Sequence, residues 1–473
     1  MTDRFAAPPH QPEPYSPKLR TALVLTGTGT AGAYHAGALR AFAEAGVKID
    51  LVAGRGIGAV GALFHAVDGA SRLWDDKGFW RAPGVDTLYR WRRMPRLAVT
   101  ALAIAAAIVA VPVIAVALGL VVFPIDFVAR MIGLGGAGGL VAWYTNAANA
   151  AFAPAMLPTW LPRLVLLVLG ATVVAALADG WRQFARQPRG PFWWRLLRAP
   201  IAGDAAFART WQVLWDLLRG AAQLRQPAAA ELARRYVEVV SDNLGQPGFR
   251  ELLITVHDID AHRDLMFALV AEHRRRDLVR RPRTNAAESR RAEIFDIAGA
   301  DRELLADAIA ASLAIPLATE PHTITFSSDS YWRGETHRVC DRPASLIRLM
   351  DELIDLGVTQ IVLVGGAADG EGPHALARPR SDGFGRLGDY VESSEAAVVR
   401  DATTTTGGVR IYTIRPVHNP IGPFDFNGGY DDRSHRHLPL GELMNRGYAD
   451  AYHQFIEPVV GASGERIERV EKL

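Results

Sequence analysis

Short apolar runs and longer amphipathic segments alternate along most of this chain. Continuous apolar runs of strand length lie at residues 20–26, 49–53, 251–257, 359–364 and 409–414. Segments with the three-to-four-residue spacing of a helix lie at residues 33–45, 57–67, 207–240, 301–314, 344–357 and 439–461. Strands that alternate with helices favour a largely parallel sheet covered by helices on both faces. The pattern therefore predicts an α/β fold with three layers.

One long apolar stretch interrupts this alternation. Residues 97–125 are 29 residues without a charged side chain, and a helix needs only about 20 to cross the hydrocarbon core. A second apolar run, residues 164–178, can cross if it extends back through Arg163, whose charged end snorkels to the interface. We expect a transmembrane helical hairpin with spans at about 97–123 and 159–179, inside an insertion at 91–199. A buried core helix is the alternative for the first span.

Residues 131–159, between the two spans, are uncharged and rich in glycine and alanine, which suits an interfacial or re-entrant segment. Arginines flank the hairpin: Arg90, Arg92, Arg93 and Arg96 before it, and Arg182, Arg186, Arg189, Arg195 and Arg198 after it. Because positive flanks stay in the cytoplasm, both ends are predicted to be cytoplasmic. We therefore predict a multi-pass protein of the cell inner membrane with a cytoplasmic main domain. Its expected partners are membrane lipids and, through the hairpin, a second copy or another protein.

Composition bounds the remaining classes of protein. The 473 residues suffice for two to three domains, and a net charge of +2 gives no reason to expect nucleic acid as a partner. The single cysteine, Cys340, excludes an intrachain disulfide and a cysteine-rich metal site. Residues 1–19 contain five prolines and no apolar signal segment, so we expect a disordered tail there. The main domain is then formed by residues 20–90 and 200–465.

A glycine-rich turn between a strand and a helix is the first candidate site. Residues 27–32, GTGTAG, fit G-x-G-x-x-G. In a dinucleotide fold such a turn binds a pyrophosphate, and Asp50 lies near the spacing of the ribose-binding acid. In an acyl hydrolase the same turn supplies backbone N–H groups to an oxyanion. A tight turn without a ligand is the third interpretation.

The residues after this turn separate these interpretations. A second strand meets a second helix at the glycine-rich elbow Gly54-Arg55-Gly56-Ile57-Gly58. Together with LITVHDID at 253–260, AIAASLAIP at 308–316 and TQIVLV at 359–364, the stretch resembles the patatin-like phospholipases. The resemblance covers residues 20–70 and 250–420. It implies a patatin-like three-layer fold, an oxyanion turn at Gly27, Thr28, Gly29, Thr30 and Gly32, and a serine–aspartate dyad. We expect no cofactor and no metal.

The elbow lacks the family's nucleophile. Gly56 occupies the serine position, and alignment places either Arg333 or Glu335 at the position of the aspartate. Asp369-Gly370 and Asp382-Gly383 follow the 359–364 strand, which is the wrong chain order. Thr28 and Ala31 also depart from the family's first turn. Since loss of the nucleophile costs on the order of 10⁶ in rate, the family's chemistry is not expected here.

These features predict a membrane-anchored patatin-like pseudoenzyme that keeps a lipid or acyl pocket for binding, scaffolding or regulation. The first alternative is a lipid acyl hydrolase with a rearranged site and a displaced nucleophile, for which Thr26, Thr28 and Ser312 are candidates. The second is nucleotide binding at the glycine-rich turn. His35 and His257 are interpreted as fold histidines. The arginine-rich residues 273–291 are interpreted as a solvated loop, with contact to anionic lipid head groups as the alternative.

Overall fold

The computed structural model describes residues 14–133, 138–153, 160–184, 199–280, 292–368, 383–405, 408–431 and 434–461. The chain forms two compact units. Unit 1 contains Met1–Arg90 and Ile201–Leu473, and unit 2 contains Trp91–Pro200. Asp369, Asp382, and Arg186, Arg189, Arg195 and Arg198 lie outside the described residues, as does most of the 273–291 segment.

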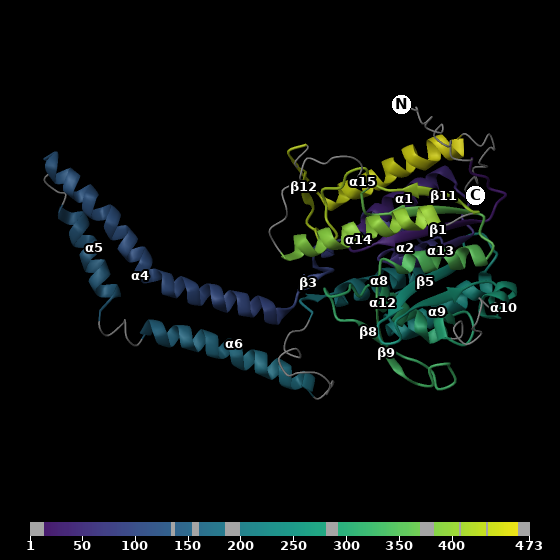
Figure 1. Cartoon of the computed structure of the whole chain (residues 1–473), viewed down its shortest axis with the longest axis horizontal. Coiled ribbons are helices and arrows are strands. Elements are labelled where there is room, and N and C mark those ends of the chain that lie inside the picture. The colour runs from purple at the N-terminus through teal and green to yellow at the C-terminus, as the bar shows by residue number, and fades with distance from the viewer. Residues whose placement is uncertain are drawn as a thin grey trace, which may run out of the picture. The chain divides into compact units, whose positions relative to one another are not determined.

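A mostly parallel sheet forms the centre of unit 1 (Figure 1). Its strand order is β11-β10-β1-β2-β5-β6-β7, with β9 pairing to β5 and β8 pairing to β9. The strands are β1 (Thr21–Gly27), β2 (Leu51–Gly56), β5 (Glu251–Asp258), β6 (Arg263–Leu269), β7 (Ile294–Asp296), β8 (His322–Thr325), β9 (Thr336–Cys340), β10 (Gln360–Gly365) and β11 (Arg410–Ile414). Neighbours pair in parallel except β5–β6, β5–β9 and β8–β9.

Helices cover both faces of this sheet because both faces of its central strands are apolar. On β1, Leu23 and Leu25 belong to one core cluster, while Ala22 and Val24 belong to the other. The helices of unit 1 are α1 (Ala31–Ala45), α2 (Gly58–His65), α3 (Ser71–Trp74), η1 (Val85–Thr87), α8 (Asp204–Arg219), α9 (Ala229–Asn243), α10 (Glu272–Arg280), η2 (Arg302–Leu304), α12 (Leu305–Ser312), α13 (Ser345–Asp355), α14 (Gly383–Thr405), α15 (Leu440–Ala451) and η3 (Tyr452–Val460). Residues of α1, α2 and α15 pack in the first cluster, and residues of α13 and α14 pack in the second.

This arrangement agrees with the predicted mostly parallel α/β sheet, and it adds elements that periodicity did not reveal. The helix expected at 207–240 is two helices, α8 and α9, with Pro227 between them. Strands β6, β7, β8 and β9 were not predicted. Short strands β3 (Arg90–Trp91), β4 (Ile201–Ala202), β12 (Gly429–Asp431) and β13 (Arg436–Leu438) complete the chain.

Unit 2 is a helical hairpin whose second arm is broken. Helix α4 (Arg93–Met131) has 39 residues, and α5 (Gly138–Ala151) and α6 (Trp160–Phe184) have 14 and 25. At 1.5 Å per residue, α4 is about 58 Å long, and α5 and α6 together reach the same length. The Tyr144 hydroxyl of α5 donates to the Ala115 carbonyl of α4 at 2.7 Å. Figure 1 shows α5 and α6 each lying along a part of α4.

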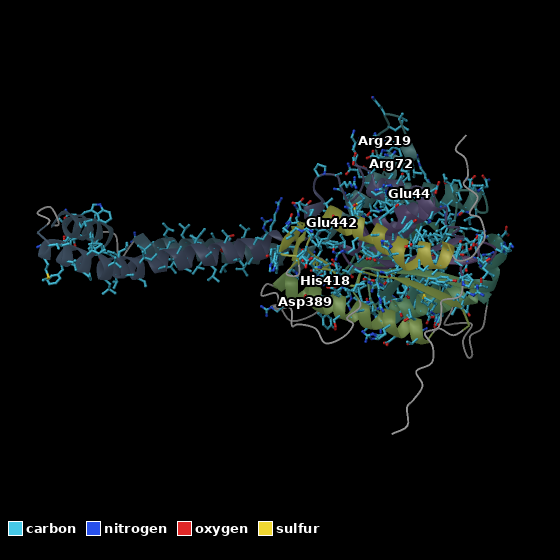
Figure 2. All side chains as sticks on the ribbon, turned by 90° about the horizontal axis from the view of Figure 1, so that it is seen from above. Glu44, Arg72, Arg219, Asp389, His418 and Glu442 are labelled. Atoms are coloured by element: carbon cyan, nitrogen blue, oxygen red, sulfur yellow. The ribbon has the colours of Figure 1, made fainter. Side chains whose placement is uncertain are left out.

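The two predicted spans correspond to α4 and α6. Among the described helices, α4 alone is long and apolar enough to cross a bilayer, over Arg96–Met131, by length and composition. The apolar part of α6, Arg163–Ala178, is shorter. Only 6% of the most apolar window of α4 is buried, and Figure 2 shows side chains of unit 2 projecting from its helices.

Candidate functional site

The glycine-rich turn lies between β1 and α1 and is covered by a distant segment of the chain. Gly29 adopts a φ of +57°, and a β-carbon there would lie 1.9 Å from the carbonyl oxygen of Pro423. The Thr30 amide donates to that same oxygen at 3.0 Å, and the Thr30 hydroxyl donates to the Gly422 carbonyl at 2.8 Å. A carbonyl group of the protein itself therefore already occupies one N–H group of the predicted oxyanion turn.

The elbow between β2 and α2 has the backbone of a nucleophile elbow without its side chain. Gly56 ends β2 with a φ of +58°, and Gly58 begins α2. A β-carbon at Gly56 would lie 2.3 Å from the Gly27 carbonyl oxygen. That oxygen also accepts the Ile57 amide at 3.0 Å. The glycine-rich turn thus contacts the elbow where a serine side chain would begin.

Asp341 is the acid that faces this elbow. A β-carbon at Gly56 would lie 2.9 Å from its Oδ2 atom. Asp341 follows β9 directly, and its amide donates to the Ala314 carbonyl at 2.8 Å. Burial, together with nearby Glu395, raises the pKa of Asp341 to about 6, although Arg55 and two backbone amides act in the opposite direction.

The sequence alignment had placed Arg333 or Glu335 at this position, and the structure puts neither of them there. Both are exposed residues in the connection between β8 and β9, and the Glu335 carboxylate lies 3.1 Å from Nε2 of His337. A search for an Asp-Gly pair misses Asp341, because Arg342 follows it. Its place two residues before Pro343 was the available signal.

Arg55 joins Asp341 to the glycine-rich turn in a buried polar network. Its guanidinium is fully buried, and Nη2 donates to Oε1 of Glu395 on α14 at 2.6 Å and lies 3.3 Å from Oδ2 of Asp341. The Thr28 hydroxyl donates to the same Glu395 oxygen at 2.5 Å. Burial acts to lower the pKa of Arg55, but Asp341 and Glu395 outweigh it, so the pKa lies above its ordinary value and Arg55 is charged. We call Thr28, Arg55, Asp341 and Glu395 the elbow network.

The space beside the elbow network is small. A cavity of about 10 Å³ is lined by residues of the turn, of α14 and of the 419–423 segment, including Thr28, Thr30, Glu392, Glu395 and Asn419. This volume holds about one water molecule and no acyl chain. Among the described residues, the space at this site is therefore too small for an acyl chain.

The other candidate residues near the site have structural contacts. His35 donates from Nε2 to the Thr26 carbonyl at 3.1 Å, and burial lowers its pKa to about 4. It is therefore a neutral residue at pH 7. The buried Ser312 hydroxyl donates to the Ile309 carbonyl at 2.9 Å within α12. His257 contacts Asp264 through Nδ1 at 2.8 Å.

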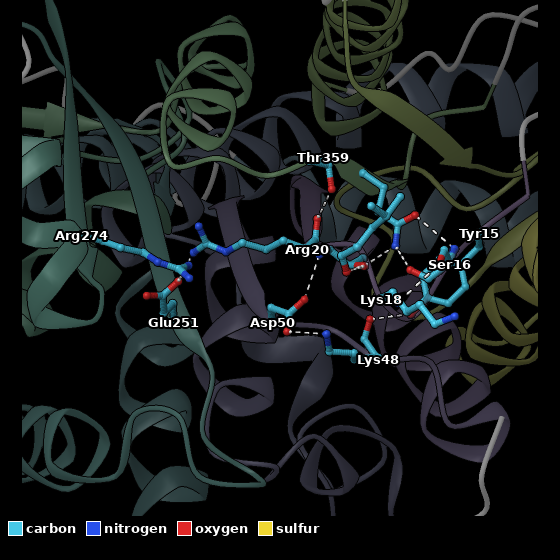
Figure 3. A network of polar contacts seen from close by, with 12 residues as sticks. Tyr15, Ser16, Lys18, Arg20, Lys48, Asp50, Glu251, Arg274 and Thr359 are labelled. Atoms are coloured by element: carbon cyan, nitrogen blue, oxygen red, sulfur yellow. Dashed lines mark hydrogen bonds and ion pairs between the residues drawn. The ribbon is translucent and has the colours of Figure 1, made fainter. Parts of the chain in front are cut away.

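Asp50 lies at the opposite end of β1 from the glycine-rich turn. Its Oδ2 accepts the Thr21 amide at 2.9 Å, and its Oδ1 pairs with Lys48 at 3.2 Å. Figure 3 shows it in a network that also contains Arg20, Glu251 and Arg274, whose Nη1 lies 3.1 Å from Glu251. Since the seven residues of β1 span about 20 Å, Asp50 cannot hold the ribose of a nucleotide bound at Gly27–Gly32. Within the described ranges, no group of three or more His, Cys, Asp or Glu residues is arranged to hold a metal ion.

Comparison with known proteins finds a family match for the segment that carries this geometry. Residues 23–118 match the family model described as Patatin-like phospholipase. The match contains both the glycine-rich turn and the elbow, and it supports a patatin-like lipid acyl hydrolase fold for this chain. Among solved structures, VipD from Legionella pneumophila is similar over 94% of this chain and 67% of its own, with 11% sequence identity and a TM-score of 0.32. A comparison with curated proteins found no match.

Proposed function

We propose that this protein is a membrane-anchored patatin-like pseudoenzyme, which binds lipid or assembles with a partner and does not hydrolyse esters through the family's serine. The observation that carries this proposal is the elbow itself. Gly56 has no side chain, the Gly27 carbonyl oxygen lies 2.3 Å from the place of a β-carbon, and Asp341 is held by Arg55. Without a nucleophile, an acid and an oxyanion turn give little catalysis.

The proposed anchor is the α4–α6 hairpin of unit 2. A core helix of a soluble protein would bury its apolar side chains, whereas most of the apolar side chains of α4 are exposed, among them Val99, Leu102, Val113 and Leu120. Exposed apolar patches on soluble monomers rarely exceed a few hundred Å², so a helix with side chains exposed on all sides requires another solvent. The arginines at 90–96 support the orientation with unit 1 in the cytoplasm, at the inner membrane.

The proposed ligand is an acyl chain of a membrane lipid, and its entry requires movement of α14. The cavity beside the elbow network holds about one water, and its walls are Glu392 and Glu395 of α14 and the segment that ends at Pro423. The first six residues of α14 include Gly383, Gly385 and Gly388, and each glycine weakens a helix by roughly 1 kcal/mol relative to alanine. Displacement of this half of α14 would open the space above Thr28 and Thr30.

The deciding experiment measures ester hydrolysis by the full chain in lipid nanodiscs, on short and long acyl esters, with a fluorophosphonate as a probe for reactive serine. We expect no turnover above the buffer rate and no labelled residue. Turnover that the probe abolishes would overturn the pseudoenzyme proposal. The anchor is tested separately by flotation with vesicles and by extraction at alkaline pH, and release at alkaline pH would overturn it.

One contact favours a second candidate function, hydrolysis through a rearranged site. The Thr28 hydroxyl donates to the Glu395 carboxylate at 2.5 Å, a pairing of hydroxyl and base that can activate a nucleophile. Arg55 donates to the same oxygen of Glu395 at 2.6 Å and so competes with Thr28 for it. An acyl adduct on Thr28, found by mass spectrometry and lost in Thr28→Val, would favour this candidate over the first.

A further inference from the structure

Residues 313–319 of unit 1 form hydrogen bonds with the chain segments just before and just after unit 2 in the sequence. The Tyr89 hydroxyl, just before the insertion, donates to the Leu313 carbonyl at 2.9 Å. The Ile201 amide, just after the insertion, donates to the Ala318 carbonyl at 2.9 Å, and Ile201 also forms a parallel bridge with Thr319. Residues 313–319 therefore form the edge of unit 1 from which the hairpin starts.

The most exposed large apolar side chain of the described residues lies in this segment. Leu317 is 83% exposed, whereas its neighbours Ile315 and Ala318 are buried. Its φ of +64° is a strained backbone conformation that a leucine rarely adopts.

Local hydrogen bonds hold this conformation. The Ala318 amide donates to the Pro316 carbonyl at 2.7 Å, and the Ile315 amide donates to the Thr319 hydroxyl at 2.8 Å. The loop thus turns one leucine outward at a cost in backbone strain. No described residue of unit 1 covers this leucine, which leaves its apolar surface for a partner.

The position of the segment indicates which partner this is. Helix α4 begins at Arg93, and the uncharged stretch begins at Leu97, which is about 6 Å farther along the helix. The head-group layer on each side of the hydrocarbon core is about 5 to 8 Å thick. Tyr89 lies eight residues before Leu97, and its hydroxyl donates to the Leu313 carbonyl, so a side chain on residues 313–319 can reach this layer.

We propose that Leu317 is a membrane-contact residue that inserts into the head-group layer of the leaflet on the side of unit 1. This inference rests on the membrane anchoring proposed above. The contact adds a third point of attachment to the two ends of the hairpin and so restricts rotation of unit 1 over the bilayer. One leucine side chain removed from water contributes too little to anchor the protein, but enough to favour one orientation of unit 1.

The test places a fluorescent label at Leu317. Burial raises the pKa of Cys340, the single native cysteine, to about 12, so NBD reagents at neutral pH label the new thiol of Leu317→Cys. In nanodiscs we expect a blue-shifted emission and strong quenching by lipids that carry a spin label near the head group. The matched control is Ile347→Cys on α13, an exposed apolar residue in a helix away from the insertion. Quenching at Leu317 no greater than at Ile347 would overturn the inference.

Vesicle flotation and the Tm of a Leu317→Gly variant distinguish failure of the membrane anchor from failure of the Leu317 contact. If the full chain does not float with vesicles, the anchor fails and Leu317 fails with it. If the chain floats but the label at Leu317 is not quenched, only the Leu317 contact fails. Leu317→Gly relieves the positive φ, so its Tm in detergent is expected not to fall, while the orienting contact is lost. A clear fall in Tm would show that Leu317 is instead needed by the fold, against the inference.

Discussion

The carboxylate of Asp341 faces the α-carbon of Gly56 across the elbow, with 2.9 Å between its Oδ2 atom and the place of a β-carbon on that glycine. This is the relationship of an acid to the nucleophile that it serves, with the nucleophile absent. The Asp341 carboxylate has other partners in the fold, because Arg55 and the Gly56 backbone amide both interact with it. Asp341 thus belongs to a buried ion-pair network that joins β2, the end of β9 and α14.

Restoring serine is expected to fail on geometric grounds. In Gly56→Ser the new β-carbon would lie 2.3 Å from the Gly27 carbonyl oxygen, at a φ of +58°. The turn has to shift or the protein loses stability, by roughly 1 to 3 kcal/mol for the backbone strain alone. We expect a lower Tm and no esterase activity. Gly56→Ala is the matched control, and an active Gly56→Ser protein with an unchanged Tm would contradict this prediction.

Removing Arg55 leaves two buried carboxylates without their cation. We expect Arg55→Leu to lower the free energy of unfolding by about 3 to 5 kcal/mol, measured by denaturant titration of the full chain in detergent. The double variant Arg55→Leu, Glu395→Leu should recover part of the lost free energy of unfolding, because it also removes one of the two buried carboxylates that have lost their cation. Arg40→Leu is the control, since its pair with Glu44 is exposed and such pairs contribute at most about 1 kcal/mol. Equal losses in both single variants would contradict a buried network.

Asp341 gives stability a specific dependence on pH. Its pKa in the folded protein is about 6, above the roughly 3.9 of an unfolded aspartate. Between these values the folded state binds more protons than the unfolded state, so stability falls as the pH rises from about 4 to about 6 and is then constant. The shift corresponds to about 3 kcal/mol. Asp341→Asn should remove this slope, and a stability profile identical to that of the unmodified protein would show that Asp341 does not titrate in this way.

The sheet could be predicted from sequence, because its central strands are buried on both faces and are therefore continuously apolar. Strand β9 could not be predicted from the sequence. It is a short strand of alternating exposed and buried residues that follows a loop, and its position fixes which acid faces Gly56. The pairing of Arg55 with Glu395 could not be predicted either, since the two residues are 340 positions apart in the sequence. Local sequence patterns were enough to predict the elbow at Gly56, whereas its partners Asp341 and Glu395 are brought to it by contacts between distant parts of the chain.

Glu395 holds α14 against the glycine-rich turn, so its removal should ease ligand entry. Glu395→Gln keeps the size of the side chain but loses the charge that Arg55 and Thr28 contact at 2.6 and 2.5 Å. Hydrogen bonds to charged groups contribute about 1.5 to 3 kcal/mol, which corresponds to a shift of about 10-fold or more toward an open state. We expect tighter binding of a fluorescent fatty acid by a similar factor, together with faster hydrogen exchange in residues 383–395. Asp389→Asn, on the exposed side of the same helix (Figure 2), should change neither quantity. Faster exchange without tighter binding would mean that α14 opens onto a site that does not accept an acyl chain.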